Sequence, residues 1–166
     1  AYAPLMYQLT ESGIDCFLVD MPFHMAFFGM NRAEEIMQEY NYEAWYLGGH
    51  SLGGAMAANF AADYVEDHTD GIRGLLLLAA YPTKDLSTSD MSVVTVYGSE
   101  DGVLNMDKIV AGRELMPQDY KEVCIEVGNH AQFGSYGAQK GDGTAAIPAE
   151  EQWARTVEVF VGDESE

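Results

Sequence analysis

Basic residues are scarce in this sequence. Eight Lys and Arg stand against 27 Asp and Glu, which gives the 166-residue chain a formal net charge of −19 at pH 7. A field of this sign repels nucleic acids and anionic lipid surfaces, so we expect neither as a partner. The acidic residues are spread along the chain without a long run, which favours a solvated surface over a disordered tail. Neutral or cationic small molecules fit this charge better as substrates.

Cysteines and long apolar runs are also few. The only two cysteines, Cys16 and Cys124, lie in apolar stretches, so we interpret both as buried core residues and not as a disulfide or as metal ligands. No Cys and His cluster has the spacing of a zinc site, and we expect no metal and no cofactor. No apolar run approaches the roughly 20 residues that cross a bilayer, which predicts a soluble globular protein without a membrane span.

The start of the chain shows neither an initiating Met nor a targeting segment. The sequence therefore sets no compartment, and a cytoplasmic location is expected only if no signal precedes Ala1. The oligomeric state is likewise not set by the sequence.

Short continuous apolar runs alternate with longer amphipathic stretches. This alternation is typical of an α/β fold with a mostly parallel sheet and helices on both faces. The pattern predicts five strands, at residues 14–20, 44–48, 74–80, 92–98 and 123–127. No internal repeat or linker interrupts the pattern, so we expect one domain over residues 1–166.

Three helices are predicted between and after these strands. Asn31 followed by Glu34 resembles a capping arrangement and begins the first. The Ala-rich stretch 52–65 predicts a helix pressed closely onto the sheet. Pro148 opens a last helix, which Gly162 is expected to end and whose buried face is expected to present Trp153, Val157 and Phe160.

Residues 48–54 read GGHSLGG, between a predicted strand and a predicted helix. The stretch lacks the Lys of a phosphate-binding loop and the spacing of a dinucleotide fingerprint, but it contains G-x-S-x-G around Ser51. A sharp turn here would project the Ser51 hydroxyl above the sheet edge, and side chains at positions 49 and 53 would collide. Ser51 is the predicted nucleophile, and the backbone N–H of Leu52 is predicted to face a developing oxyanion. The alternative is a structural turn with an incidental serine.

A serine nucleophile needs a base and an acid. Where the serine lies on a G-x-S-x-G turn, the acid comes next along the chain and the histidine comes last. Asp101 follows a predicted strand within GSEDG, and His130 follows the next within GNHAQFG. Glu100 is the nearest rival for the acid, whereas Asp107 is expected in the first turn of the next helix. We therefore predict a triad of Ser51, Asp101 and His130.

The other histidines fit less well as the base. His24 precedes the nucleophile, His50 lies inside the turn and is interpreted mainly as a packing residue, and His68 is expected in an exposed loop. A substrate pocket is predicted from residues that follow a strand or flank Ser51, namely Phe23, His24, Met25 and His50, with Phe27 and Phe28 beside them. Ordinary core packing of the aromatic residues is the alternative.

These motifs together resemble the α/β-hydrolase superfamily, in particular its compact, lid-poor, carboxylesterase-like bacterial branch. The resemblance covers the whole chain and rests on YAPLMYQLTESGIDCFLVDMPFH, GGHSLGGAMAANFA, GLLLLAAYP, VYGSEDGV and GNHAQFGSYGAQKGDG. It implies the same triad, with Leu52 as one oxyanion donor. Family members begin with a strand and a second oxyanion donor that precede the helix at residues 2–12, so the resemblance implies an N-terminally truncated domain.

The sequence thus predicts a serine esterase that acts on a small-molecule ester. Two alternatives stay open. An acyltransferase would deliver the acyl group from the same acyl-enzyme to an alcohol or thiol, and a noncatalytic module would bind a ligand in the same pocket without turnover.

Overall fold

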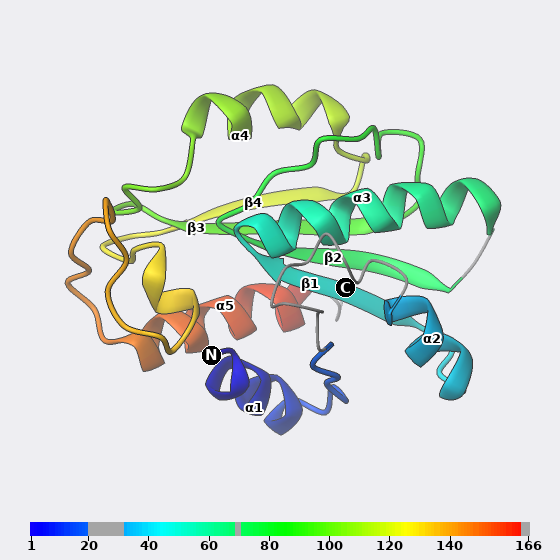
Figure 1. The fold of residues 1–166 in the computed structure, drawn as a ribbon, viewed down its shortest axis with the longest axis horizontal. Coiled ribbons are helices and arrows are strands. Elements are labelled where there is room, and N and C mark those ends of the chain that lie inside the picture. The colour runs from blue at the N-terminus through cyan, green and yellow to red at the C-terminus, as the bar shows by residue number, and fades with distance from the viewer. Residues whose placement is uncertain (20–31, 69–70, 164–166) are drawn as a thin grey trace. The chain divides into compact units, whose positions relative to one another are not determined.

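The computed structural model describes residues 1–19, 32–68 and 71–163. It forms a parallel sheet of four strands with helices (Figure 1). In chain order the elements are α1 (Ala3–Glu11), α2 (Arg32–Glu39), β1 (Trp45–His50), α3 (Leu52–Asp67), β2 (Ile72–Leu78), β3 (Ser92–Gly98), α4 (Met106–Gly112), η3 (Arg113–Leu115), β4 (Tyr120–Ile125), η4 (Ala131–Phe133) and α5 (Ala149–Asp163).

The chain divides into two compact units. The first unit consists of Ala1–Phe17, Val96–Leu104 and Glu122–Glu166. The second unit consists of Leu18–Thr95 and Asn105–Lys121.

The strands follow one another in the sheet in the order β1-β2-β3-β4. β1 and β2 are parallel, with a register that runs from Trp45 opposite Ile72 to His50 opposite Leu78. Parallel neighbours need a long crossover between them, and α3 provides it by packing on β1 and β2. β1 ends at His50 and α3 begins at Leu52, so Ser51 is the single residue between them.

The predicted strand at residues 14–20 is wrong over its described part. Residues 14–19 belong to neither helix nor strand, and Asp20 lies outside the described residues. Leu18 is 63% exposed. An apolar run becomes a strand only where a neighbouring strand supplies hydrogen bonds, and the run itself does not contain that information. The other four strands are confirmed, with bounds that differ from the predicted ones by at most three residues.

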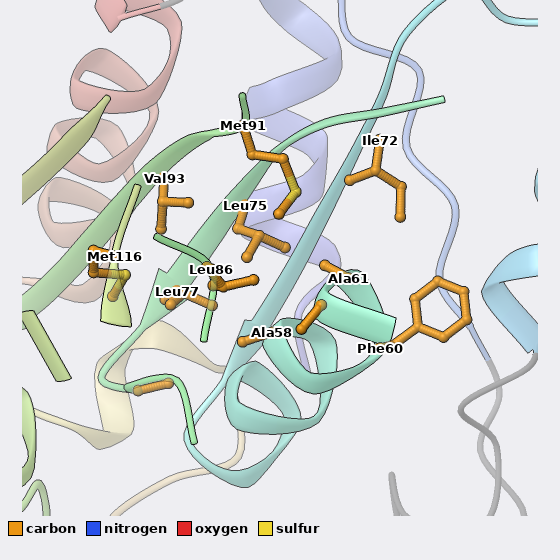
Figure 2. Close-up of a cluster of buried hydrophobic side chains, with 12 residues drawn as sticks. Ala58, Phe60, Ala61, Ile72, Leu75, Leu77, Leu86, Met91, Val93 and Met116 are labelled. Atoms are coloured by element: carbon orange, nitrogen blue, oxygen red, sulfur yellow. The ribbon is translucent and has the colours of Figure 1, made fainter. Parts of the chain in front are cut away.

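A hydrophobic cluster in the second unit joins α3 to the sheet (Figure 2). Leu75 and Leu77 of β2 and Val93 of β3 are fully buried together with Ala58 and Ala61 of α3. The small alanine side chains let the helix backbone approach the strands, which confirms the predicted Ala-rich helix. Each buried Leu stabilises the fold by roughly 1.5–3 kcal/mol, so the cluster fixes α3 firmly on β2.

In the first unit, α1 packs against α5. Leu5 and Leu9 are the buried residues of α1. The predicted buried face of the last helix is confirmed, because Trp153, Val157 and Phe160 are each less than 9% exposed. α5 begins directly after Pro148 but continues to Asp163, so Gly162 does not end it.

α2 confirms the helix predicted after residue 31. Asn31, its predicted cap, lies outside the described residues. The exposed face of α2 carries an ion pair of Arg32 with Glu35 at 2.8 Å and a hydrogen bond from Gln38 to Glu34 at 3.0 Å. Pairs at three- and four-residue spacing stabilise such helices by a few tenths of a kcal/mol.

The interpretation of both cysteines as core residues is wrong. Cys124 is exposed on β4, and Cys16 is only partly buried. Side chains alternate between the two faces of a strand, so the burial of Ile125 turns its neighbour Cys124 the other way. Both thiols are free.

Candidate active site

Ser51 occupies a strained position between β1 and α3. Its backbone has φ 54° and ψ −124°, a conformation that costs a non-glycine residue roughly 1–3 kcal/mol. The N–H of Ser51 donates to the carbonyl of Leu78 at 2.8 Å, and its own carbonyl accepts the N–H of Gly54 at 3.0 Å. Within the described residues, the Ser51 side chain forms no capping hydrogen bond to α3. Its hydroxyl therefore does not serve as an ordinary helix cap.

The close approach at this turn involves Gly49 and Gly54. A Cβ at Gly49 would lie 2.5 Å from backbone atoms of Gly53 and Gly54, which confirms that position 49 tolerates no side chain. A Cβ at Gly54 would lie 2.5 Å from the Cβ of Ala80 and 2.7 Å from the Gly49 carbonyl oxygen. The predicted collision at position 53 is wrong, because a Cβ there meets nothing within 4 Å. Successive helical residues are rotated by about 100°, so Gly54 and not Gly53 faces the strand.

Gly54→Ala is expected to lower the free energy of unfolding by about 1–3 kcal/mol, because the added methyl group meets a backbone carbonyl and a fixed Cβ. Gly53→Ala is the matched control. Its methyl group enters open space, and alanine is the better helix former, so stability should stay the same or rise. Urea unfolding of the two variants measures the difference. Equal destabilisation by both would contradict the close packing of Gly54.

Leu52 and His50 flank Ser51. Leu52 is the first residue of α3, so its N–H is one of the four at a helix start that have no partner within the helix. The Leu52 side chain is 62% exposed. His50 ends β1 and is 8% exposed, a burial in keeping with a packing role.

Asp101 and His130 form a buried pair in the first unit. The Nδ1 atom of His130 lies 2.8 Å from Oδ2 of Asp101, and the two side chains are 1% and 2% exposed, respectively. The second carboxylate oxygen of Asp101 accepts the backbone N–H groups of Val103 at 2.9 Å and Leu104 at 2.7 Å. Both oxygens of Asp101 are thus engaged, one by its own loop and one by the imidazole ring.

Glu100, the rival acid, is placed differently. Its side chain accepts a hydrogen bond from the hydroxyl of Ser99 at 3.2 Å, in an exposed position. The structure therefore pairs Asp101, and not Glu100, with the His130 ring. Asp107 lies in the first turn of α4, as predicted.

The surroundings of Asp101 lower the pKa of its carboxyl. Burial alone would raise this pKa, but hydrogen bonds from the His130 ring and from the N–H groups of Leu104 and Val103, together with the positive charge of protonated His130, lower it. A lowered pKa in the folded state means that the ionised carboxylate stabilises the fold. This stabilisation is present above the unfolded-state pKa of about 3.9 and is lost as the pH falls through the folded-state pKa.

The free energy of unfolding is therefore expected to depend on pH through Asp101. The unmodified protein should be more stable than Asp101→Asn near pH 6. The difference should begin to shrink near the unfolded-state pKa of about 3.9 and should keep shrinking until the pH is below the lowered folded-state pKa, by about 1.4 kcal/mol in total for each unit of pKa lowering. Urea titrations between these conditions measure it, and a difference that does not change with pH would contradict the assigned environment.

Two polar side chains support the loop that carries His130. The fully buried Gln152 of α5 accepts the Asn129 N–H at 3.1 Å and donates to the Asn129 carbonyl at 2.8 Å. The hydroxyl of Ser99 accepts the Val127 N–H at 2.8 Å and so joins the end of β3 to the same loop. Neither role was predicted. The one sequence signal is that Gln152 directly precedes Trp153, at the edge of the apolar face of the last helix.

The predicted site residues belong to both units. The second unit contains His50, Ser51 and Leu52, and the first unit contains Asp101 and His130. His68 is exposed, as predicted, at the end of α3, where its ring stacks on Tyr64 with centroids 4.0 Å apart. The predicted pocket residues Phe23, His24, Met25, Phe27 and Phe28 lie outside the described residues.

Metal sites and membrane-spanning helices do not occur in the described ranges. In residues 1–19, 32–68 and 71–163, no three His, Cys, Asp or Glu side chains gather closely enough to hold a metal ion. None of the helices in these ranges has the length and apolar character that crossing a bilayer requires.

The sequence matches the family model described as the alpha/beta hydrolase family over residues 1–154. No protein of curated function matches it. Among solved structures, a monoacylglycerol lipase from Paleococcus ferrophilus is similar with a TM-score of 0.71 and 16% identity, over 98% of this chain and 89% of that one. The esterase domain of a Rhodothermus marinus protein is similar with a TM-score of 0.69 and 12% identity, over 96% of this chain and 76% of that one. At these identities the likeness shows the fold alone.

Proposed function

The chain belongs to the alpha/beta hydrolase family, and from this premise we propose that it is a serine hydrolase that cleaves a carboxylic ester through an acyl-enzyme on Ser51. The observation that carries the proposal is the buried hydrogen bond between His130 and Asp101. A carboxylate held against Nδ1 of an imidazole fixes the tautomer in which Nε2 can accept a proton. This is the arrangement that a serine nucleophile requires of its base.

In the first half of the proposed reaction, Oγ of Ser51 attacks the ester carbonyl carbon. The hydroxyl proton passes to Nε2 of His130, and the Asp101 carboxylate stabilises the imidazolium that forms. The N–H of Leu52, at the start of α3, donates to the negative oxygen of the tetrahedral intermediate. His130 then returns the proton to the leaving alkoxide, so an alcohol departs and the acyl group remains on Ser51.

In the second half, water takes the place of the alcohol. His130 accepts a proton from the water as the water oxygen attacks the acyl carbon, and the proton then returns to Oγ of Ser51. The products are the carboxylic acid and the free serine. No redox change takes place, and in each half of the reaction His130 accepts one proton and then releases it.

Two features of Ser51 support its assignment as the nucleophile. Non-glycine residues in strained backbone conformations cluster at functional sites, and Ser51 has φ 54°. Its hydroxyl is not used to cap α3. A helix start also favours negative charge, which suits an oxyanion formed beside Leu52.

The proposed substrate class is a small neutral or cationic ester. A net charge of −19 disfavours the approach of anionic substrates. The similar solved structures are described as a monoacylglycerol lipase and an esterase domain, which is in keeping with ester substrates.

A series of chromogenic esters with increasing acyl-chain length tests the proposal. The purified protein is expected to release the chromophore with saturation kinetics, and the best chain length reports the size of the acyl pocket. Added alcohol acceptors reveal whether the acyl group goes to water or to the acceptor, which separates a hydrolase from an acyltransferase. Saturable binding of the esters without chromophore release would overturn the proposal in favour of a noncatalytic binding module.

A further inference from the structure

The side chain of Asp142 gathers four backbone N–H groups around one carboxylate. Oδ1 accepts the N–H of Gly102 at 3.2 Å, of His130 at 3.2 Å and of Gly143 at 2.9 Å. Oδ2 accepts the N–H of Ala131 at 2.8 Å. All five residues belong to the first unit.

Three of these donors come from the two loops that carry the buried pair, and the fourth, Gly143, directly follows Asp142. Gly102 directly follows Asp101, and its N–H reaches Asp142 across 40 residues of sequence. His130 and Ala131 donate from the other loop, across 12 and 11 residues. A single carboxylate thus holds the backbone beside the acid and the backbone of the histidine itself.

Backbone packing on both sides keeps Asp142 in this position. A Cβ at Gly102 would lie 2.3 Å from the carbonyl oxygen of Gly141, and a Cβ at Gly143 would lie 2.0 Å from that of Glu100. The segment 141–143 therefore lies directly against the loop 100–102. The carboxylate between the two glycines has little freedom to leave its four donors.

We propose that Asp142 is a positioning residue for the Asp101–His130 pair. A carboxylate is a strong hydrogen-bond acceptor, so the three bonds from Gly102, His130 and Ala131 keep the two loops in register. The proposal rests on the proposed function, because positioning matters only if His130 acts as the base. Catalytic groups need their geometry to within about 0.5 Å, and an error of 1 Å can cost about 10²-fold in rate.

The variants Asp142→Ala and Asp142→Asn test this role against the control Asp85→Asn. The exposed carboxylate of Asp85 also accepts a loop N–H, that of Ser87 at 2.9 Å, but it lies in the other unit. Asp142→Ala is expected to lower kcat on a chromogenic ester by about 10²-fold with little change in KM. Asp142→Asn should fall between Asp142→Ala and the unmodified protein, because its amide oxygen can keep three donors while its NH₂ group faces the Ala131 N–H. Asp85→Asn should leave kcat unchanged.

A second readout does not depend on Ser51. The proton on Nδ1 of His130, bonded to Asp101, should give a low-field ¹H NMR resonance in the unmodified protein and in Ser51→Ala. That resonance should broaden or vanish in Asp142→Ala and persist in Asp85→Asn. A purely stabilising role would leave both kcat and the resonance intact at temperatures well below unfolding, and this result would overturn the proposal.

The two proposals fail in different ways. If the unmodified protein turns over no ester, the proposed function fails, and the resonance still decides whether Asp142 positions the pair. If turnover is present but Asp142→Ala changes neither kcat nor the resonance, only the positioning role fails. Should Asp142→Ala not fold, Asp142→Asn decides by the same two readouts.

Discussion

Ser51→Ala is expected to abolish ester turnover and to leave the fold intact. Loss of a triad nucleophile can cost about 10⁶-fold in kcat, because the remaining groups cannot form the acyl-enzyme. The free energy of unfolding should change little, since the Ser51 hydroxyl does not cap α3. Initial rates on a chromogenic ester and a urea unfolding curve measure the two quantities.

Ser87→Ala serves as the control for this experiment, because it removes an exposed serine hydroxyl from the same unit. It should retain full activity. A purified, folded Ser51→Ala protein that keeps most of its turnover would refute the assignment of Ser51 as the nucleophile.

Asp101→Asn is expected to lower turnover by up to about 10⁴-fold, the second-largest effect. The amide has nearly the shape of the carboxylate, but it favours the wrong tautomer of the imidazole and cannot stabilise the imidazolium. Glu100→Gln is a closely matched control, because it neutralises the adjacent, exposed carboxylate that does not contact the ring.

The two variants should therefore separate clearly in kcat at neutral pH. Equal losses in Asp101→Asn and Glu100→Gln would indicate a general effect of charge in this loop. A larger loss in Glu100→Gln would reverse the choice of the acid.

Local sequence patterns predicted much of the candidate site. The motif around Ser51 predicted a strand that ends just before it and a helix that starts just after it, and β1 and α3 confirm both. The order of the motifs along the chain selected Asp101 and His130, which the structure joins at 2.8 Å. These features could be predicted because a few adjacent residues determine where a strand ends and a turn begins.

Features that depend on distant partners could not be predicted. The four donors of Asp142 come from segments up to 40 residues away, and no local pattern marks such a carboxylate. The run at residues 14–19 has strand-like composition but forms no strand. A strand needs hydrogen bonds from a neighbouring strand, and the run itself does not specify that partner. Cys124 is likewise exposed, since the face that a strand buries is set by what packs on it.

The turn around Ser51 requires a different glycine from the one that the motif contains. The motif names Gly53, whereas the close contact in the structure belongs to Gly54 and Gly49. The direction of each Cβ follows from the start of the helix, and a shift of one residue rotates it by about 100°. The motif thus predicts a close approach of the strand and helix backbones at this turn, but the orientation of the helix determines which of its glycines is required.

The reaction of the protein with a fluorophosphonate tests whether His130 activates the hydroxyl of Ser51. This reagent phosphonylates a serine hydroxyl that a neighbouring base has activated, with fluoride as the leaving group. Peptide mapping by mass spectrometry is expected to find the label on Ser51 alone, and His130→Ala is expected to stop the labelling almost completely. An unlabelled Ser51, or labelling of Ser51 that proceeds equally fast in His130→Ala, would contradict the activation of Ser51 by His130.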